Sequence, residues 1–249
     1  MCRGERVSAA VYLAAAFVVG VCVSGGRASA GDIWADNNAA RVILFSGSDI
    51  WRSGVFAHGG LLWSPGGLDQ EGFTLKTVLA GGRYRYNSGD LGNVGVTGSE
   101  LTAQLLPGWR FKGDRLEVKV FMGLDVESHR LSPDDPSNRL HGHAVGMRMA
   151  ADFWYEPTAT TMLAADASLS SIVTSNSARL AYGWRVFDMF YLGPETQMFA
   201  SEGYRQLRFG AHLTGLKTGN FEWSAASGWA EDSGRRSSPY LRLGVLTRQ

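Results

Sequence analysis

The chain has 249 residues, of which 45% are hydrophobic and 11% aromatic, with 32 glycines and only 7 prolines. This composition fits one sizeable domain and indicates extended, tightly turning backbone rather than disorder or a helical bundle. The formal net charge is +1, so the charge balance gives no electrostatic footprint for nucleic acid.

The first thirty residues differ from the rest of the chain. Two arginines precede a charge-free run at Ala9–Val23, and small residues then lead to Ala30. This order predicts a secretory signal peptide over residues 1–30, cleaved near Ala30, and one exported domain over 31–249. A lipoprotein signal at Cys22 is the alternative, which the bulky residue before that cysteine disfavours. Both cysteines of the chain lie in this leader, so the exported domain holds no disulfide.

Apolar residues after the leader alternate with polar ones, and few recur at helical spacing. In the stretch 116–127, "LEVKVFMGLDVE", every second residue is apolar, which predicts a strand with one greasy and one polar face. Clusters of Gly, Pro, Asn, Asp and Ser separate about twelve such segments. The predicted strands lie near 41–51, 54–64, 72–86, 97–111, 115–129, 140–155, 160–171, 176–187, 190–200, 203–213, 218–231 and 238–247.

An exported chain of many amphipathic strands, with Trp and Tyr near their ends, is typical of a transmembrane barrel. The sequence therefore predicts an all-β fold, an antiparallel outer-membrane-type β-barrel of about 12 strands (10 to 14). A β-sandwich in the periplasm is the alternative, because it would show similar alternation.

One predicted connection is longer than a hairpin needs. If both ends of the barrel are periplasmic, "PGGLDQE" is a periplasmic turn, and such turns are usually short. We therefore predict that Pro65, Leu68, Asp69 and Glu71 form a docking surface for a partner, and a plain loop is the alternative.

The sequence shows no nucleophile elbow, phosphate loop or clustered zinc spacing. Ser128 and His129 are neighbours on a predicted strand and point to opposite faces. His141 and His143 would share a face, but no third ligand lies close in sequence. We therefore predict no catalytic residue, no metal site and no cofactor.

The predicted inward faces carry seven basic and seven acidic residues. They are Arg110, Lys119, Arg148, Arg179, Arg185, Arg208 and Arg242, with Glu117, Asp125, Glu127, Asp152, Asp166, Glu195 and Glu222. Opposite charges in so small a barrel are expected to pair across strands and fill the lumen, and a narrow polar pore is the alternative. Candidate sugar-binding residues on these faces are Trp154, Tyr191, Phe199, Tyr204, Tyr240, Arg148, Arg185 and Arg208.

Long stretches of the chain resemble the BcsS family of cellulose biosynthesis proteins. They include "FAHGGLLWSPGGLDQEGFTLK", "SHRLSPDDPSNRL", "DFWYEPTATTMLAADASLS", "FYLGPETQMF" and "YRQLRFGAHLTGLKTGNFEWSAASGWAEDS". The resemblance covers nearly the whole exported domain. It implies an accessory role in making or exporting cellulose, and it supplies no catalytic residues.

Together these observations predict a non-enzymatic outer-membrane accessory of cellulose biosynthesis. Its expected partners are outer-membrane lipid, the cellulose chain, and periplasmic or outer-membrane components of a cellulose synthase complex. One alternative is an outer-membrane hydrolase of lipid or polysaccharide with His129 or His58 as base, and another is a purely structural surface barrel. The hydrolase would bring such a histidine close to a serine and an aspartate.

Overall fold

The computed structural model describes residues 40–249 except 202 and 235. The predicted signal peptide and its cleavage site lie outside these residues. Among the residues described, no helix is both long enough and apolar enough to cross a membrane.

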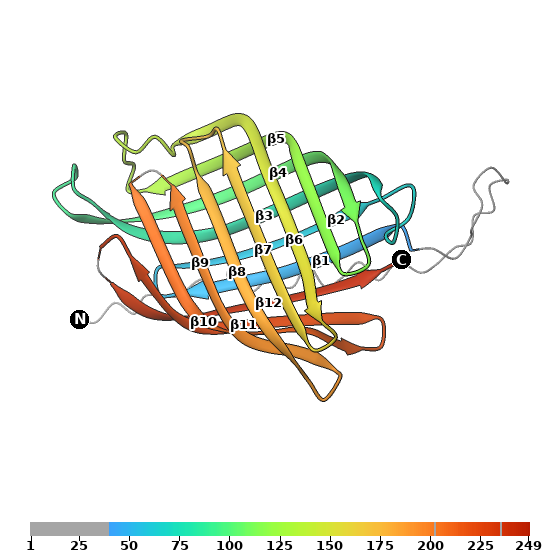
Figure 1. Cartoon of the computed structure of the whole chain (residues 1–249). Helices are drawn as coiled ribbons and strands as arrows, with labels where there is room; N and C mark the ends of the chain where they lie inside the picture. Colours follow the sequence, from blue (N-terminus) through green and yellow to red (C-terminus); the bar gives the residue numbers. More distant parts are fainter. Residues whose placement is uncertain (1–39, 202, 235) are drawn as a thin grey trace. The chain divides into compact units, whose positions relative to one another are not determined.

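Twelve antiparallel strands form one closed barrel, in which each strand pairs with its neighbours in sequence and β1 pairs with β12 (Figure 1). This confirms the predicted fold. The strands are β1 (Val42–Trp51), β2 (Gly54–Trp63), β3 (Gly72–Ser88), β4 (Val94–Lys112), β5 (Leu116–Ser132), β6 (Gly142–Thr158), β7 (Thr161–Ser170), β8 (Asn176–Val186), β9 (Phe190–Ser201), β10 (Tyr204–Thr218), β11 (Phe221–Asp232) and β12 (Ser237–Arg248).

The barrel has two ends, which we name by the segments they carry. The terminal end holds the start of β1, the end of β12 and the connection 64–71 between β2 and β3. The loop end holds the opposite connections, of which 133–141 between β5 and β6 spans the most residues. Figure 1 shows the β3–β4 hairpin reaching beyond the other strands at the loop end.

The alternation seen in the sequence separates the two faces of the barrel. On β5, Val120, Met122 and Leu124 are exposed on the outer surface, whereas Phe121 and Asp125 are buried. Residues opposite each other on neighbouring strands share a face, so the register carries this assignment around the barrel. By this register, all fourteen charged residues expected inside face the lumen.

The strand ends differ from the expected ones mainly at the loop end. Strand β4 begins at Val94 rather than near residue 97, and β5 continues to Ser132 rather than to 129. The added residues are 94–96 and 130–132, which adjoin the turn-forming clusters predicted to end the strands. These residues extend β4 and β5 beyond the β1–β2 turn at residues 52–53.

Candidate functional site in the barrel lumen

The connection 64–71 folds into the terminal end of the lumen. The amide of Leu68 donates to the carbonyl of Ala40 at 2.8 Å, and the amide of Ser64 donates to the carbonyl of Arg41 at 2.8 Å. Gly67 has φ of 105°, which favours glycine there. These bonds hold the turn against the barrel entrance and direct Leu68 inward.

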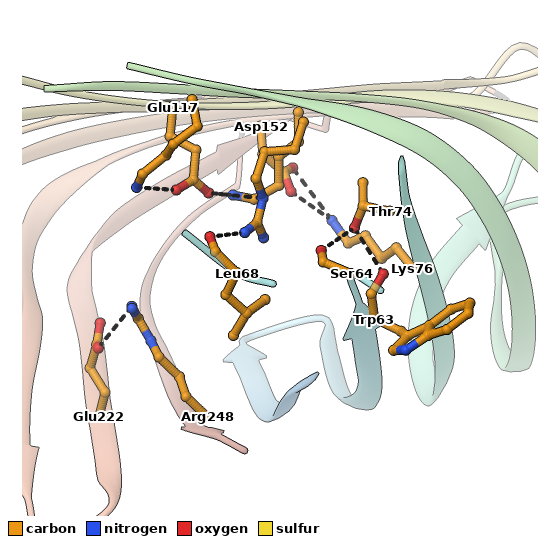
Figure 2. Close-up of polar contacts among 12 residues, drawn as sticks. Trp63, Ser64, Leu68, Thr74, Lys76, Glu117, Asp152, Glu222 and Arg248 are labelled. Carbon is orange, nitrogen blue, oxygen red and sulfur yellow. Dashed lines mark hydrogen bonds and ion pairs between the residues drawn. The ribbon is translucent and has the colours of Figure 1, made fainter. Parts of the chain in front are cut away.

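Leu68 packs into an apolar layer inside the barrel. It is 5% exposed and forms one buried cluster with Leu62, Leu106 and Phe121. Its carbonyl accepts a hydrogen bond from the Arg110 guanidinium, and Figure 2 shows this contact beside the Glu117 carboxylate. The turn is therefore part of the folded core at this end.

Charged side chains surround the apolar layer. The carboxylate of Glu117 is held by Lys112 at 2.8 Å, by Lys119, and by the Nε of Arg110 at 3.8 Å. Lys76 reaches Asp152 at 3.1 Å, although β3 and β6 are not neighbouring strands. Figure 2 shows this ion pair above the side chains of the connection. The pair therefore links two separated parts of the wall.

Further ties cross the middle of the lumen. Arg208 on β10 pairs with Asp49 on β1 at 2.7 Å, and its guanidinium lies 4.9 Å from the ring centre of Trp51. Arg242 on β12 pairs with Glu195 on β9, which also binds Arg179 at 3.0 Å. Strands β10 and β1 are not adjacent in the barrel, and neither are β12 and β9, so the Arg208–Asp49 and Arg242–Glu195 pairs span the lumen.

A polar cluster lies inside β3, β4 and β5 towards the loop end. The Tyr84 oxygen lies 3.4 Å from Nδ1 of His129, and Nε2 of the same ring lies 3.1 Å from the Glu127 carboxylate. Arg148 pairs with Asp125 at 2.8 Å and with Glu127 at 3.3 Å. The two acids of this cluster belong to the predicted set of inward charges, whereas His129 and Tyr84 do not.

The loop 133–141 is anchored over this cluster by one acid. Asp135 is 2% exposed and accepts hydrogen bonds from the hydroxyls of Tyr86 at 2.9 Å and Ser137 at 2.7 Å. The Ser137 bond contributes most to lowering the pKa of Asp135. The acids Asp134 and Asp135 are thus part of a turn, and Asp135 faces inward.

The eight candidate sugar-binding residues all face the lumen, but they do not meet at one place. Trp154 stacks edge-on with Tyr191, over which Arg185 lies, and this group is near the terminal end. Phe199 contacts Tyr204 at the loop end. The other three are Arg148 in the polar cluster and Arg208 with Tyr240 in the middle. Spacing along strands could not predict this separation.

The four residues predicted to dock a partner also differ from one another. Pro65, Asp69 and Glu71 are exposed at the terminal end, whereas Leu68 is buried. A surface partner therefore has access to the acids and the proline, while Leu68 serves the core. The sequence could not separate these roles because the turn has no periodicity.

Among the described residues, His129, His141 and His143 do not form a hydrolase constellation with a serine. His129 faces the lumen beside Tyr84 and Glu127, whereas Ser128 points to the outer face, as the alternation predicted. His141 lies in the exposed loop and pairs with Asp134 at 3.2 Å. His143 is exposed on the outer face.

A separate cavity of about 420 Å³ opens at the loop end. Its lining includes Arg52, Arg85 and Arg236, from three segments of the chain, together with Tyr86. Among the described residues, no ion pair joins these arginines to a carboxylate. The lining of this cavity therefore carries basic side chains, whereas the polar cluster inside the barrel carries more acids than bases.

Solved structures similar to this fold are outer-membrane barrels. An outer membrane channel from Pseudomonas putida F1 is 13% identical with a TM-score of 0.54, covering 90% of this chain and 100% of that one. A TodX mutant, described as a monoaromatic hydrocarbon channel, is 9% identical with a TM-score of 0.50, covering 84% and 89%. At such identities the likeness shows the fold alone.

Sequence comparison identifies the family. No curated protein matches the chain. The family described as cellulose biosynthesis protein BcsS matches residues 43–249, which include nearly the whole barrel. The match confirms the resemblance found in the sequence, and the chain belongs to the BcsS family of cellulose biosynthesis proteins.

Proposed function

We propose that this protein is a non-enzymatic outer-membrane accessory of cellulose biosynthesis. In this proposal the barrel anchors a docking surface for a partner protein in the membrane and does not conduct the glucan chain. The observation that carries this proposal is the set of side chains that span the lumen. Ion pairs join non-neighbouring strands across it, and the connection 64–71 packs into its terminal end. A glucan chain entering the lumen would have to break several ion pairs whose side chains are partly or fully buried.

The lengths of the connections support an orientation with the terminal end in the periplasm. Barrels of this class carry their longer connections outside the cell, and the loop end holds 133–141 and the raised β3–β4 hairpin. The exposed face of the connection 64–71 then looks into the periplasm. That face presents Pro65, Asp69 and Glu71.

We therefore propose that this face docks a periplasmic component of the cellulose synthase complex. A hairpin needs only about two residues to reverse the chain, whereas this connection spans eight positions, 64–71. Leu68 and Arg110 fix its backbone. The two exposed acids are thus presented on a rigid support, which lowers the entropic cost of binding.

The test replaces the acids without disturbing the core. Asp69→Asn with Glu71→Gln is expected to leave heat-modifiable gel mobility unchanged and to lower cellulose at the cell surface. Cross-linking to the partner from a cysteine at the exposed neighbouring position Gln70 should fall in parallel. The matched control is Asp90→Asn, an exposed acid on the β3–β4 turn at the opposite end.

Three outcomes separate the candidate functions. Unchanged cellulose in the double variant would refute docking at this face. Unchanged cellulose after deletion of the whole protein would favour a purely structural barrel. Loss of cellulose on deletion, restored by a barrel with Glu127→Gln and His129→Gln, would exclude the hydrolase that uses that histidine.

Aromatic residues at the terminal end offer a second contact within the same function. Trp154 and Tyr191 form a T-shaped pair beside Arg185 near the rim, and such rings suit the faces of sugar units. We propose that they contact the glucan at the terminal rim of the barrel, without its passage through the lumen. Quenching of tryptophan fluorescence by cello-oligosaccharides should be weaker in Trp154→Phe than in Trp184→Phe, whose indole lies on the outer face.

A further inference from the structure

The polar cluster inside β4 and β5 brings three metal-ligating side chains to one point. Glu100 and His129 are direct partners in the β4–β5 register, and Glu127 lies two residues from His129 on the same face. One ligand atom from each of the three lies within 4.8 Å of the others. His129 and Glu127 are only 4% and 5% exposed.

The charges of this cluster do not balance. Three carboxylates, those of Glu100, Asp125 and Glu127, face the lumen together, and Arg148 is the cation paired with two of them. The Oδ1 atom of Asp125 is buried and has no hydrogen-bond partner. Buried negative charge without compensation is costly, so the cluster has room for a further positive charge.

The histidine is oriented as a metal ligand would be. The Tyr84 oxygen lies 3.4 Å from Nδ1, so an Nδ1–H group can donate to it and leave the Nε2 lone pair facing Glu127. A hydroxyl group on Thr102 donates to Glu100 at 3.0 Å and fixes that carboxylate. Each prospective ligand therefore has an outer partner.

From this geometry we propose that Glu100, Glu127 and His129 bind one divalent transition-metal ion, of the class represented by Zn²⁺. Imidazole nitrogen and carboxylate oxygen atoms are both ligands for such ions. The ion neutralises the excess acid and ties β4 to β5 beneath the loop 133–141. The competing state is a protonated His129 that bridges the acids without metal.

The first measurement is Zn²⁺ binding to metal-stripped, full-length mature barrel in detergent micelles, by calorimetry. We expect one Zn²⁺ per chain, with affinity weakened at least about tenfold in Glu100→Gln and in His129→Gln. Tyr84→Phe should weaken it less. Co²⁺ should give visible absorption bands that disappear in His129→Gln, a signal that a merely structural role of the histidine would not produce.

Two control variants test whether Zn²⁺ binds at other histidines of the chain. His212→Gln removes another buried lumen histidine, which contacts Thr214 and the Tyr182 carbonyl instead of acids, and it should leave Zn²⁺ binding unchanged. His141→Gln with His143→Gln removes the loop histidines and should also leave it unchanged. All variants are compared only if their heat-modifiable mobility matches the wild type.

Two results would overturn the proposal. One is the absence of Zn²⁺ binding by the wild-type protein, which would favour the protonated bridge. The other is Zn²⁺ binding that survives Glu100→Gln at full affinity. If His129→Gln fails to fold, Glu100→Gln and the Co²⁺ spectrum decide.

Discussion

The two ends of the lumen are closed in different ways by the same set of strands. At the terminal end, a backbone turn packs Leu68 onto an apolar layer, and Glu117 is surrounded by three basic side chains. At the loop end, side chains of β3, β4 and β5 carry more acids than bases, and a longer loop lies above them. Apolar packing thus stabilises one end and polar contacts the other, which predicts unequal responses to mutation and to pH.

Removing Arg110 should have the largest effect, because its buried guanidinium joins the turn to the wall. Arg110→Met takes the donor from the Leu68 carbonyl and one of three cations from Glu117. We expect a loss of about 3 kcal/mol in unfolding free energy, since breaking a buried polar contact leaves its partner unsatisfied. Urea unfolding followed by tryptophan fluorescence measures it.

The control for this change is Lys112→Met, which removes a more exposed cation from the same carboxylate. An exposed pair contributes at most about 1 kcal/mol. Equal losses in the two variants would show that Arg110 does not hold the turn.

Truncating Leu68 should have the next largest effect. Leu68→Ala leaves a gap between Leu62, Leu106 and Phe121, and we expect a loss of about 2 kcal/mol because a turn can partly relax into the space. The same unfolding experiment measures it. Asp69→Ser, a change at an exposed neighbour, should remain near the wild type, and a neutral Leu68→Ala would place the side chain outside the core.

Weakening the contacts that anchor the loop 133–141 should have the smallest effect on the stability of the barrel. Asp135→Asn weakens the bonds from Tyr86 and Ser137, so the loop should be cut faster by trypsin after Arg139 while the barrel stays folded. Because the pKa of Asp135 is lowered in the folded protein, its contribution is present above the ordinary aspartate range. It is lost as pH falls through the lowered pKa.

Hydrogen exchange of the loop 133–141 in the wild-type protein, measured across that acidic range, tests whether the loop loosens as pH falls. Loosening that instead began as pH rose would contradict the role given to Asp135. The turn 64–71 serves as the internal control, because its buried bonds are made by backbone groups and an arginine.

The fold could be predicted because it depends on local alternation. Period two along β5 placed Asp125 and Glu127 inside and Val120 outside, and closure of the barrel preserves both. The contacts inside could not be predicted, because they depend on which strands face each other across the lumen. Lys76 and Asp152 are a case in point, since they lie 76 positions apart and on non-neighbouring strands.

The grouping of Glu100, Glu127 and His129 in the polar cluster could not be predicted for a different reason. Glu127 and His129 are spaced so that they share a strand face, which is a signal present in the sequence. Their third partner, Glu100, is identified only by the β4–β5 register. His141 and His143 have a spacing that places them on one strand face, but the structure places His141 in the exposed loop and His143 on the outer face.

The account is tested most directly by locking the lumen and measuring cellulose release. Lys76→Cys with Asp152→Cys replaces a cross-lumen ion pair, and a short bis-maleimide can join the two thiols because the exported domain has no other cysteine. Single-cysteine variants treated with the reagent are the control, after protein synthesis is stopped. We predict that cross-linked cells release as much cellulose as the controls, whereas loss of release on cross-linking would show that the glucan passes through the barrel.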